Sequence, residues 1–190
     1  MNYSIFQAIN SLAFRSSLLD RIMILFSTVV PTCFMIVLAA FYFYGIYKKD
    51  MKYRCIAVNT VAATAINLVL SYAIGLVFFV PRPFVNHKVN LLLPHVADAS
   101  FPSDHSIGTM SIALGINNGF KLYGRIMIVL SCFVGLSRIF VGHHYPLDVL
   151  GGFAIALLMN KLYRLLLSNR VCKLYTFAEK RLCKLISFSK

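Results

Sequence analysis

The sequence predicts an all-α protein, a polytopic membrane helix bundle with five transmembrane spans and a short N-terminal helix. Of its 190 residues 59% are hydrophobic, and the mean hydropathy is +0.75. Charged residues make up only 13%, about half of the usual share. A net charge of +13 would suggest nucleic-acid binding in a soluble protein, but this apolar content favours a membrane protein.

Two stretches without any charged side chain, residues 22–47 and 55–81, are the clearest spans. Each is long enough to cross about 30 Å of hydrocarbon at about 1.5 Å per residue. Three weaker spans are expected at about 106–120, 124–141 and 147–167. Because unpaired charges in lipid are costly, Arg138 and Asp148 should face the bundle interior or the membrane edge.

The N-terminal segment before the first span is predicted to be a short surface helix, because Ile5, Ile9 and Leu12 recur at helical spacing. It lacks a basic start and a small-residue cleavage site, so a cleaved signal peptide is not expected.

The basic residues predict the orientation of the spans. Of the 19 lysines and arginines, four lie at residues 48–54, two at the turn of Lys121 and Arg125, and eight from Lys161 onwards. These 14 fall on one side of the membrane and five on the other, which places the first side in the cytoplasm. We therefore expect a membrane-embedded domain at residues 1–167 and a basic cytoplasmic tail at residues 168–190. The five cysteines are expected to be reduced thiols.

The groups that can do chemistry gather on the outer side. All five histidines lie there: His87, His95, His105, His143 and His144. Two arginines and three aspartates accompany them: Arg82, Arg138, Asp98, Asp104 and Asp148. Ionisable groups at membrane depth are candidates for a functional site.

The stretch "SRIFVGHHYPLD", residues 137–148, places a histidine four residues before an aspartate. If helical geometry reaches back to His144, it lies about 40° from Asp148 around the axis and can donate its ring N–H to the carboxylate. That bond would fix the tautomer and free the other ring nitrogen as a nucleophile or base. The alternative is a His–Asp pair that only closes a helix end.

The stretch "VPRPFV", residues 80–85, holds Arg82 between two prolines that fix the chain. A guanidinium held at the membrane surface suits bidentate contact with phosphate. The alternative is an interfacial arginine that reaches towards lipid headgroups.

The stretch "ASFPSDHS", residues 99–106, contains Ser103, Asp104 and His105 in succession. Neighbours on a helix point about 100° apart, so these three cannot form a catalytic triad. Ser103 fits the N-cap of a helix whose free N–H groups bind an anion, with His105 above it. The alternative is an ordinary helix cap with an acidic first turn.

Together these stretches predict a phosphoryl-transfer site. Arg82, Arg138 and Ser103 would hold the phosphate oxygens. His144, oriented by Asp148, would attack phosphorus, and His105 would protonate the leaving oxygen.

The blocks "PRP" at 81–83, "PSDH" at 102–105 and "SRIFVGHHYPLD" at 137–148 resemble the three signature blocks of the type 2 phosphatidic acid phosphatase superfamily. The resemblance covers roughly residues 55–165. It implies a six-helix bundle, a phosphohistidine on His144 without a metal, and an N-terminal segment that forms the first helix. It also places Asp104 in the phosphate-binding block, although its carboxylate should point away from a bound anion.

One position departs from the family pattern. The first block usually begins with a lysine seven residues before the arginine, and here that position is Gly75. A phosphate-binding cation is therefore missing, or another residue such as Lys88 supplies it.

Within this superfamily, "PRPFV", "DASFPSDHS" and "VGHHYPLDVLGG" resemble the undecaprenyl-diphosphatases of the bacitracin-resistance type. That resemblance implies a polyprenyl diphosphate lipid as substrate, an active site on the outer face of a bacterial plasma membrane and recycling of a cell-wall carrier lipid. Two alternatives stay open. One is a lipid phosphatase acting on phosphatidic acid or phosphatidylglycerol phosphate, and the other is a transporter or drug-binding membrane protein.

Overall fold

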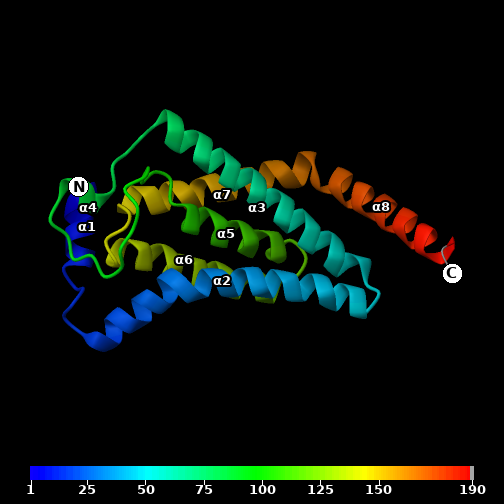
Figure 1. The fold of residues 1–190 in the computed structure, drawn as a ribbon, viewed down its shortest axis with the longest axis horizontal. Coiled ribbons are helices and arrows are strands. Elements are labelled where there is room, and N and C mark those ends of the chain that lie inside the picture. Colours follow the sequence, from blue (N-terminus) through cyan, green and yellow to red (C-terminus); the bar gives the residue numbers. More distant parts are fainter. Residues whose placement is uncertain (189–190) are drawn as a thin grey trace.

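The computed structural model describes residues 1–188, and these residues are helical apart from the connecting segments (Figure 1). The helices are α1 (Asn2–Asn10), α2 (Ser17–Tyr47), α3 (Met51–Val77), α4 (Pro83–Asn86), α5 (Asp104–Asn117), α6 (Lys121–Phe140), α7 (Pro146–Leu166) and α8 (Ser168–Phe188). In this part of the chain the only β pairing is an isolated bridge between Pro81 and Ala99. The predicted all-α membrane fold is confirmed.

The long helices α2, α3, α6 and α7 run alongside one another around α5 (Figure 1). Each of the four is long and apolar enough to cross a membrane, and their outward-facing side chains are largely exposed aliphatic and aromatic groups. These four helices correspond to the predicted spans 22–47, 55–81, 124–141 and 147–167.

Helix α5 corresponds to the predicted span 106–120, but it has only 14 residues and is therefore about 21 Å long. It packs against α2, α3, α6 and α7. Ile107, Ala113 and Ile116 on it are fully buried. Because its surroundings are protein rather than lipid, its length need not match the hydrocarbon thickness.

Helix α1 covers one end of the bundle, together with the long connection between α3 and α5 (Figure 1). Phe6 of α1 is fully buried and contacts the ring of Tyr145, at a centroid distance of 5.6 Å. The Asn10 side chain donates to the carbonyls of Asn90 and Phe140, both at 2.8 Å. Helix α1 therefore ties the α3–α5 connection to the end of α6.

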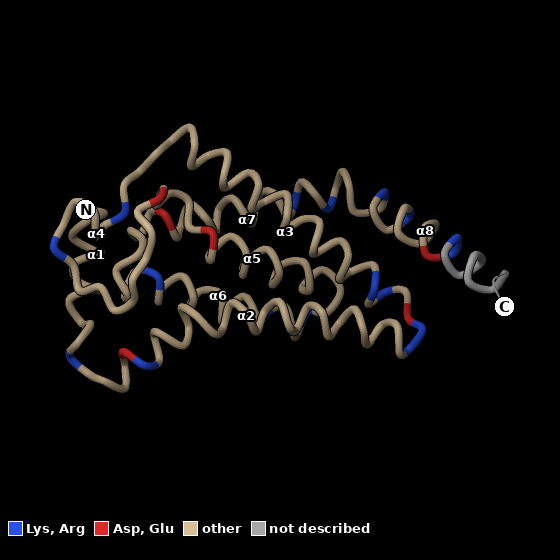
Figure 2. Tube along the Cα trace, in the orientation of Figure 1, with Lys and Arg blue, Asp and Glu red and all other residues tan. Residues whose placement is uncertain are grey.

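Helix α8 continues beyond the opposite end of the bundle and carries many of the basic residues of the predicted tail (Figure 2). Its first half lies against α3, where Arg54 forms an ion pair with Glu179. Cys55 and Cys172 form a disulfide, with their Cα atoms 5.3 Å apart. The prediction of reduced thiols is wrong for this pair, because the fold of α8 brings two cysteines separated by 117 residues together.

The other cysteines fit the prediction as far as the structure describes them, since Cys33 and Cys132 are free thiols. The side chain of Cys183 and the last residue of the predicted tail, Lys190, lie outside what the structure describes.

Candidate active site

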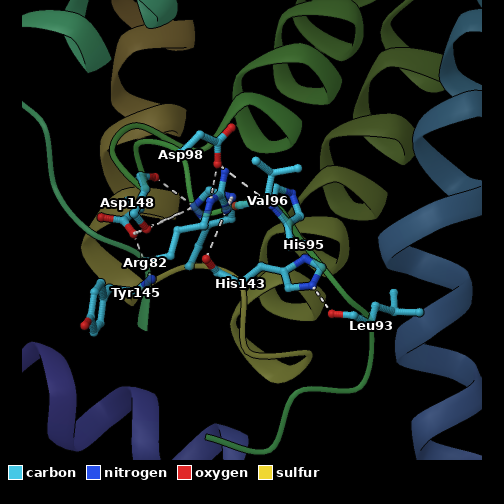
Figure 3. Close-up of polar contacts among 10 residues, drawn as sticks. Arg82, Leu93, His95, Val96, Asp98, His143, Tyr145 and Asp148 are labelled. Atoms are coloured by element: carbon cyan, nitrogen blue, oxygen red, sulfur yellow. Dashed lines mark hydrogen bonds and ion pairs between the residues drawn. The ribbon is translucent and has the colours of Figure 1, made fainter. Parts of the chain in front are cut away.

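The predicted site residues meet at the end of the bundle covered by α1. Two connections carry them, the long one between α3 and α5 and the short one between α6 and α7 (Figure 3). The remaining residues come from the first turns of α5 and α7 and the last turn of α6. Arg82, Arg138, Ser103, His144 and Asp148 are all buried.

His144 is brought to Arg138 by a tight turn at the end of α6. Gly142 has φ +92°, a conformation that L side chains rarely adopt. The backbone N–H groups of His143 and His144 both donate to the carbonyl of Arg138, at 3.0 and 3.2 Å. The sequence "SRIFVGHH" thus places a cationic side chain and a histidine in one compact turn.

The ring of His144 has a defined partner on each nitrogen. Nδ1 lies 2.8 Å from the carbonyl oxygen of Ser100, and Nε2 lies 2.9 Å from Nη1 of Arg82. A carbonyl only accepts and a guanidinium only donates, so the proton belongs on Nδ1 and the lone pair on Nε2. This is the tautomer that a nucleophilic Nε2 requires.

Asp148 lies beside this ring, but the geometry differs from the predicted direct hydrogen bond. Its Oδ2 is 3.8 Å from His144 Nδ1. The same oxygen accepts from Ser100 Oγ at 2.5 Å and from the N–H of Tyr145 at 2.8 Å. Helix α7 begins at Pro146, so helical geometry does not reach back to His144. Asp148 instead lies in the first turn of α7 and caps that helix by accepting from the N–H of Tyr145.

Arg82 occupies the centre of the site (Figure 3). Its Nε donates to Asp98 Oδ1 at 2.6 Å, and its Nη1 donates to the carbonyl of His143 at 3.1 Å as well as facing His144. The side chain of Asp98 is 58% exposed, so this carboxylate lies at the mouth of the site.

Arg138 approaches the same site from α6. Its Nη1 donates to Ser27 of α2 at 2.7 Å. Its Nε and Nη2 are buried and have no hydrogen-bond partner. Buried donors are rarely left unpaired, so these two N–H groups mark a place where an anion would be bound.

Ser103 is the N-cap of α5, as predicted, but its hydroxyl makes no cap bond. It accepts instead from Ser106 Oγ at 3.1 Å. Its backbone N–H donates to the carbonyl of Asp148 at 3.1 Å, which joins the start of α5 to the start of α7. His105 lies in the first turn of α5 and lines an apolar groove between α2 and α3.

Asp104 turns towards α3, and its Oδ1 accepts from Ser71 Oγ at 2.5 Å. Gly75 lies one turn further along α3, where a Cβ would come within 3.2 Å of Ala99. The space that the family's lysine would use is therefore filled by the segment that carries Ser100. Lys88 is exposed.

The histidines to which the sequence assigned no role pack around the site. Nε2 of His143 lies 2.9 Å from the carbonyl of Leu93. The ring of His95 packs against His143, at a centroid distance of 4.5 Å. His87 stacks on Tyr3 of α1 at 3.9 Å. Among the described residues no three His, Cys, Asp or Glu side chains gather as a set that could hold a metal ion.

Burial controls the charge of the central groups. It lowers the pKa of His144 to about 4, and the positive charges of Arg82 and Arg138 act in the same direction, whereas Asp148 opposes them. Partial burial alone would raise the pKa of Asp98, but the hydrogen bond and charge of Arg82 lower it. At neutral pH the site thus presents a neutral imidazole beside two guanidinium groups.

Two residues of the site were not identified from the sequence. Ser100 touches both His144 and Asp148, and Ser27 of α2 holds Arg138. Ser100 stands three positions before Ser103 in "ASFPSDHS". It is a small polar residue whose neighbours in that stretch are apolar. Ser27 lies within a charge-free span, where nothing in the pattern singles it out.

Comparisons with known proteins identify the family of this chain. The family model described as the PAP2 superfamily matches residues 53–172. The undecaprenyl-diphosphatase BcrC of Bacillus subtilis (strain 168) is 38% identical, over 86% of this chain and 82% of that protein. The bacitracin transport permease protein BcrC of Bacillus licheniformis is 31% identical, over 83% of this chain and 76% of that protein.

A solved structure supports the same assignment. The crystal structure of Aquifex aeolicus LpxE superimposes with a TM-score of 0.70 at 28% identity. The match covers 85% of this chain and 93% of that one. With the three sequence blocks gathered at one end of the bundle, this chain belongs to the PAP2 superfamily, the type 2 phosphatidic acid phosphatases.

Proposed function

We propose that this protein hydrolyses undecaprenyl diphosphate to undecaprenyl phosphate and inorganic phosphate. The observation that carries the proposal is a neutral His144 with its Nε2 lone pair directed at Arg82, next to the two unpaired donors of Arg138. A nucleophile beside donors placed for phosphate oxygens is the arrangement that phosphoryl transfer requires. The substrate follows from the relative in Bacillus subtilis, which bears the name undecaprenyl-diphosphatase.

In the proposed reaction Nε2 of His144 attacks the terminal phosphorus and forms an N–P bond. The bond from phosphorus to the bridging oxygen breaks, and its electron pair stays on the lipid phosphate, which His105 protonates. In the second step water gives a proton to His105 and adds to phosphorus, the N–P bond breaks with its electron pair returning to Nε2, and phosphate is released. Arg82, Arg138, Ser103 and the first backbone N–H groups of α5 hold the oxygens throughout.

An apolar groove supports a lipid substrate. It has a volume of about 900 Å³ and lies between α2 and α3 over α5. Its lining includes Met35, Tyr42, Val58, Ala65, Gly108 and Ile112, and His105 and Asp104 lie along it. The chain of the lipid would lie in this α2–α3 groove while its diphosphate reaches the site past His105.

The charge distribution supports an outward-facing site. Of the two ends of the bundle, the one opposite the site carries the α2–α3 turn with Lys48 and Lys49, and α8 extends from it (Figure 2). By the rule that lysine and arginine stay inside, we assign that end and the C-terminus to the cytoplasm of a bacterial plasma membrane. In this arrangement α5 is the fifth crossing helix. Faster hydrolysis of undecaprenyl diphosphate on the outer face would confer bacitracin resistance.

Two other functions remain to be separated by experiment. The same site residues would serve a lipid phosphatase acting on phosphatidic acid or phosphatidylglycerol phosphate. The relative in Bacillus licheniformis is named a transport permease. Buried charged groups that converge at one end of the bundle favour an enzyme over a transport pathway.

The test is a phosphate-release assay on the purified protein with undecaprenyl diphosphate, farnesyl diphosphate, phosphatidic acid and phosphatidylglycerol phosphate. We expect the highest kcat/KM with undecaprenyl diphosphate, no activity in His144→Ala, and unchanged activity in EDTA. A higher kcat/KM for a glycerolipid would establish the broad lipid phosphatase instead. Loss of activity in EDTA that added metal restores would refute the metal-free mechanism.

A further inference from the structure

Ser100 is fully buried and lies between the ring of His144 and the carboxylate of Asp148. Its carbonyl oxygen is 2.8 Å from His144 Nδ1, and its hydroxyl donates to Asp148 Oδ2 at 2.5 Å. The same hydroxyl is 3.5 Å from His144 Nδ1. One residue therefore touches both members of the pair that the sequence predicted to bond directly.

The backbone around Ser100 is fixed from two sides. Its N–H donates to the carbonyl of Val80 at 2.8 Å, and the preceding residue, Ala99, pairs with Pro81. Gly75 of α3 leaves just enough space for Ala99 to approach. Ser100 and Arg82 are thus carried by two segments that are hydrogen-bonded to each other, so the backbone links the two partners of the His144 ring.

The carbonyl of Ser100 contacts His144 and its hydroxyl contacts Asp148, which explains how the ring is held without a direct hydrogen bond to Asp148. The Ser100 carbonyl accepts a hydrogen bond from the Nδ1–H of His144, which leaves the lone pair on Nε2. Oδ2 of Asp148 is already bound by Ser100 Oγ and the Tyr145 N–H. These two donors hold the carboxylate 3.8 Å from Nδ1, where its charge can stabilise the positive ring that forms during transfer.

We infer that Ser100 is a positioning residue for phosphoryl transfer, an inference that rests on the proposed phosphohistidine function. Its carbonyl sets the tautomer of His144, and its hydroxyl aims the carboxylate of Asp148 at the ring. When the N–P bond forms at Nε2, the ring becomes positively charged while Nδ1 keeps its proton and its bond to Ser100. The hydroxyl therefore matters most after the attack begins, when that charge develops.

The experiment compares Ser100→Ala with Ser131→Ala, a matched control. Ser131 is equally buried and also hydrogen-bonded, to Thr109 at 2.8 Å, but it lies in the middle of α6. We expect Ser100→Ala to lower kcat roughly 10- to 100-fold, as the loss of a hydrogen bond to a charged group does, with KM within about twofold of wild type because ground-state binding is unaffected. Ser131→Ala should keep both constants.

A double-mutant cycle with Asp148→Asn separates positioning from general structural support. If the Ser100 hydroxyl acts through the Asp148 charge, Ser100→Ala should have much less effect in the Asp148→Asn background. Ser100→Cys keeps nearly the same volume with a weaker donor, so it should reproduce the loss of kcat if the alanine variant does not fold.

Four outcomes are informative. Wild-type kcat in Ser100→Ala would overturn the inference, and so would full additivity with Asp148→Asn. Absence of phosphate release by the wild-type protein from every lipid in the panel would instead overturn the proposed function, and the inference with it. Activity in the wild type and a coupled loss of kcat in Ser100→Ala would support both.

Discussion

The protonation of His144 is decided by two neighbours and by burial. Ser100 accepts at Nδ1, Arg82 donates towards Nε2, and burial disfavours a second proton. A histidine in this setting stays neutral at pH values where an exposed one, with a pKa of about 6.5, is half protonated. Nε2 of His144 is therefore unprotonated throughout the neutral and mildly acidic range.

This environment predicts the pH dependence of both activity and stability. The acidic limb of kcat/KM, corrected for substrate ionisation, should fall near pH 4, because the pKa of His144 is lowered to about 4. Since the unfolded chain has the ordinary pKa of about 6.5, it binds more protons between these values, and the free energy of unfolding should decline as the pH falls below about 6.5. An acidic limb at pH 6.5 or above would contradict a buried, neutral His144.

Asp104 is the least expected residue near a phosphate site, since a carboxylate repels a bound anion. Its hydrogen bond to Ser71 directs it towards α3. We predict that Asp104→Asn keeps kcat/KM within about threefold of wild type, because the amide oxygen can still accept from Ser71 and the position is exposed. A loss of 100-fold or more would mean that the charge takes part in the reaction.

At the scale of elements, α3 packs closely against the segment that carries Ser100 and does not contribute a charged side chain to the site. Gly75 allows the segment of Ala99 and Ser100 to pack on the helix. We predict that Gly75→Lys, which restores the residue usual in the family, lowers kcat at least about tenfold by displacing Ser100, through overpacking of a tight contact. The loss of kcat in Gly75→Ala should be smaller. A rise in activity in Gly75→Lys would show that the site lacks a cation.

The α2–α3 groove predicts how chain length affects the reaction. Ala65→Phe should raise KM for undecaprenyl diphosphate roughly tenfold by filling the groove, and leave kcat/KM for farnesyl diphosphate unchanged. The matched control is Ile66→Phe, at the same depth of α3 but about 100° around the helix and outside the groove. Equal effects of the two variants, or equal effects on both substrates, would contradict a lipid chain in this groove.

At the scale of the whole molecule, the distribution of charged residues along the sequence predicts how the helices and the site are arranged. Charge-free stretches predict the long helices, and the arginines and histidines at their ends predict where the site assembles. The span 106–120 was harder to delimit, because a helix surrounded by protein needs neither a full membrane length nor a lipid-facing surface. The pairing of α8 with α3 through Cys55 and Cys172 depends on contacts over a long separation, which no local pattern encodes.

In the candidate site too, the sequence could not predict contacts between segments that are far apart along the chain. The types and order of His144, Asp148, Arg82 and Ser103 follow from local motifs, so the sequence could predict them. The direct His144–Asp148 bond was wrong, because it assumed that α7 begins before His144, whereas Pro146 starts the helix. Ser100 was missed because its role depends on two segments that meet only in the folded chain.

The most direct test of the account is to trap the phosphorylated enzyme. Wild-type protein is mixed with undecaprenyl diphosphate labelled on its terminal phosphate, quenched rapidly and mapped by peptide. We predict an acid-labile, base-stable label on the peptide that follows Arg138, retained in His143→Asn and absent in His144→Ala, which should fold but release no phosphate. Phosphate release at the wild-type rate by His144→Ala, or a label on another residue, would contradict the central claim.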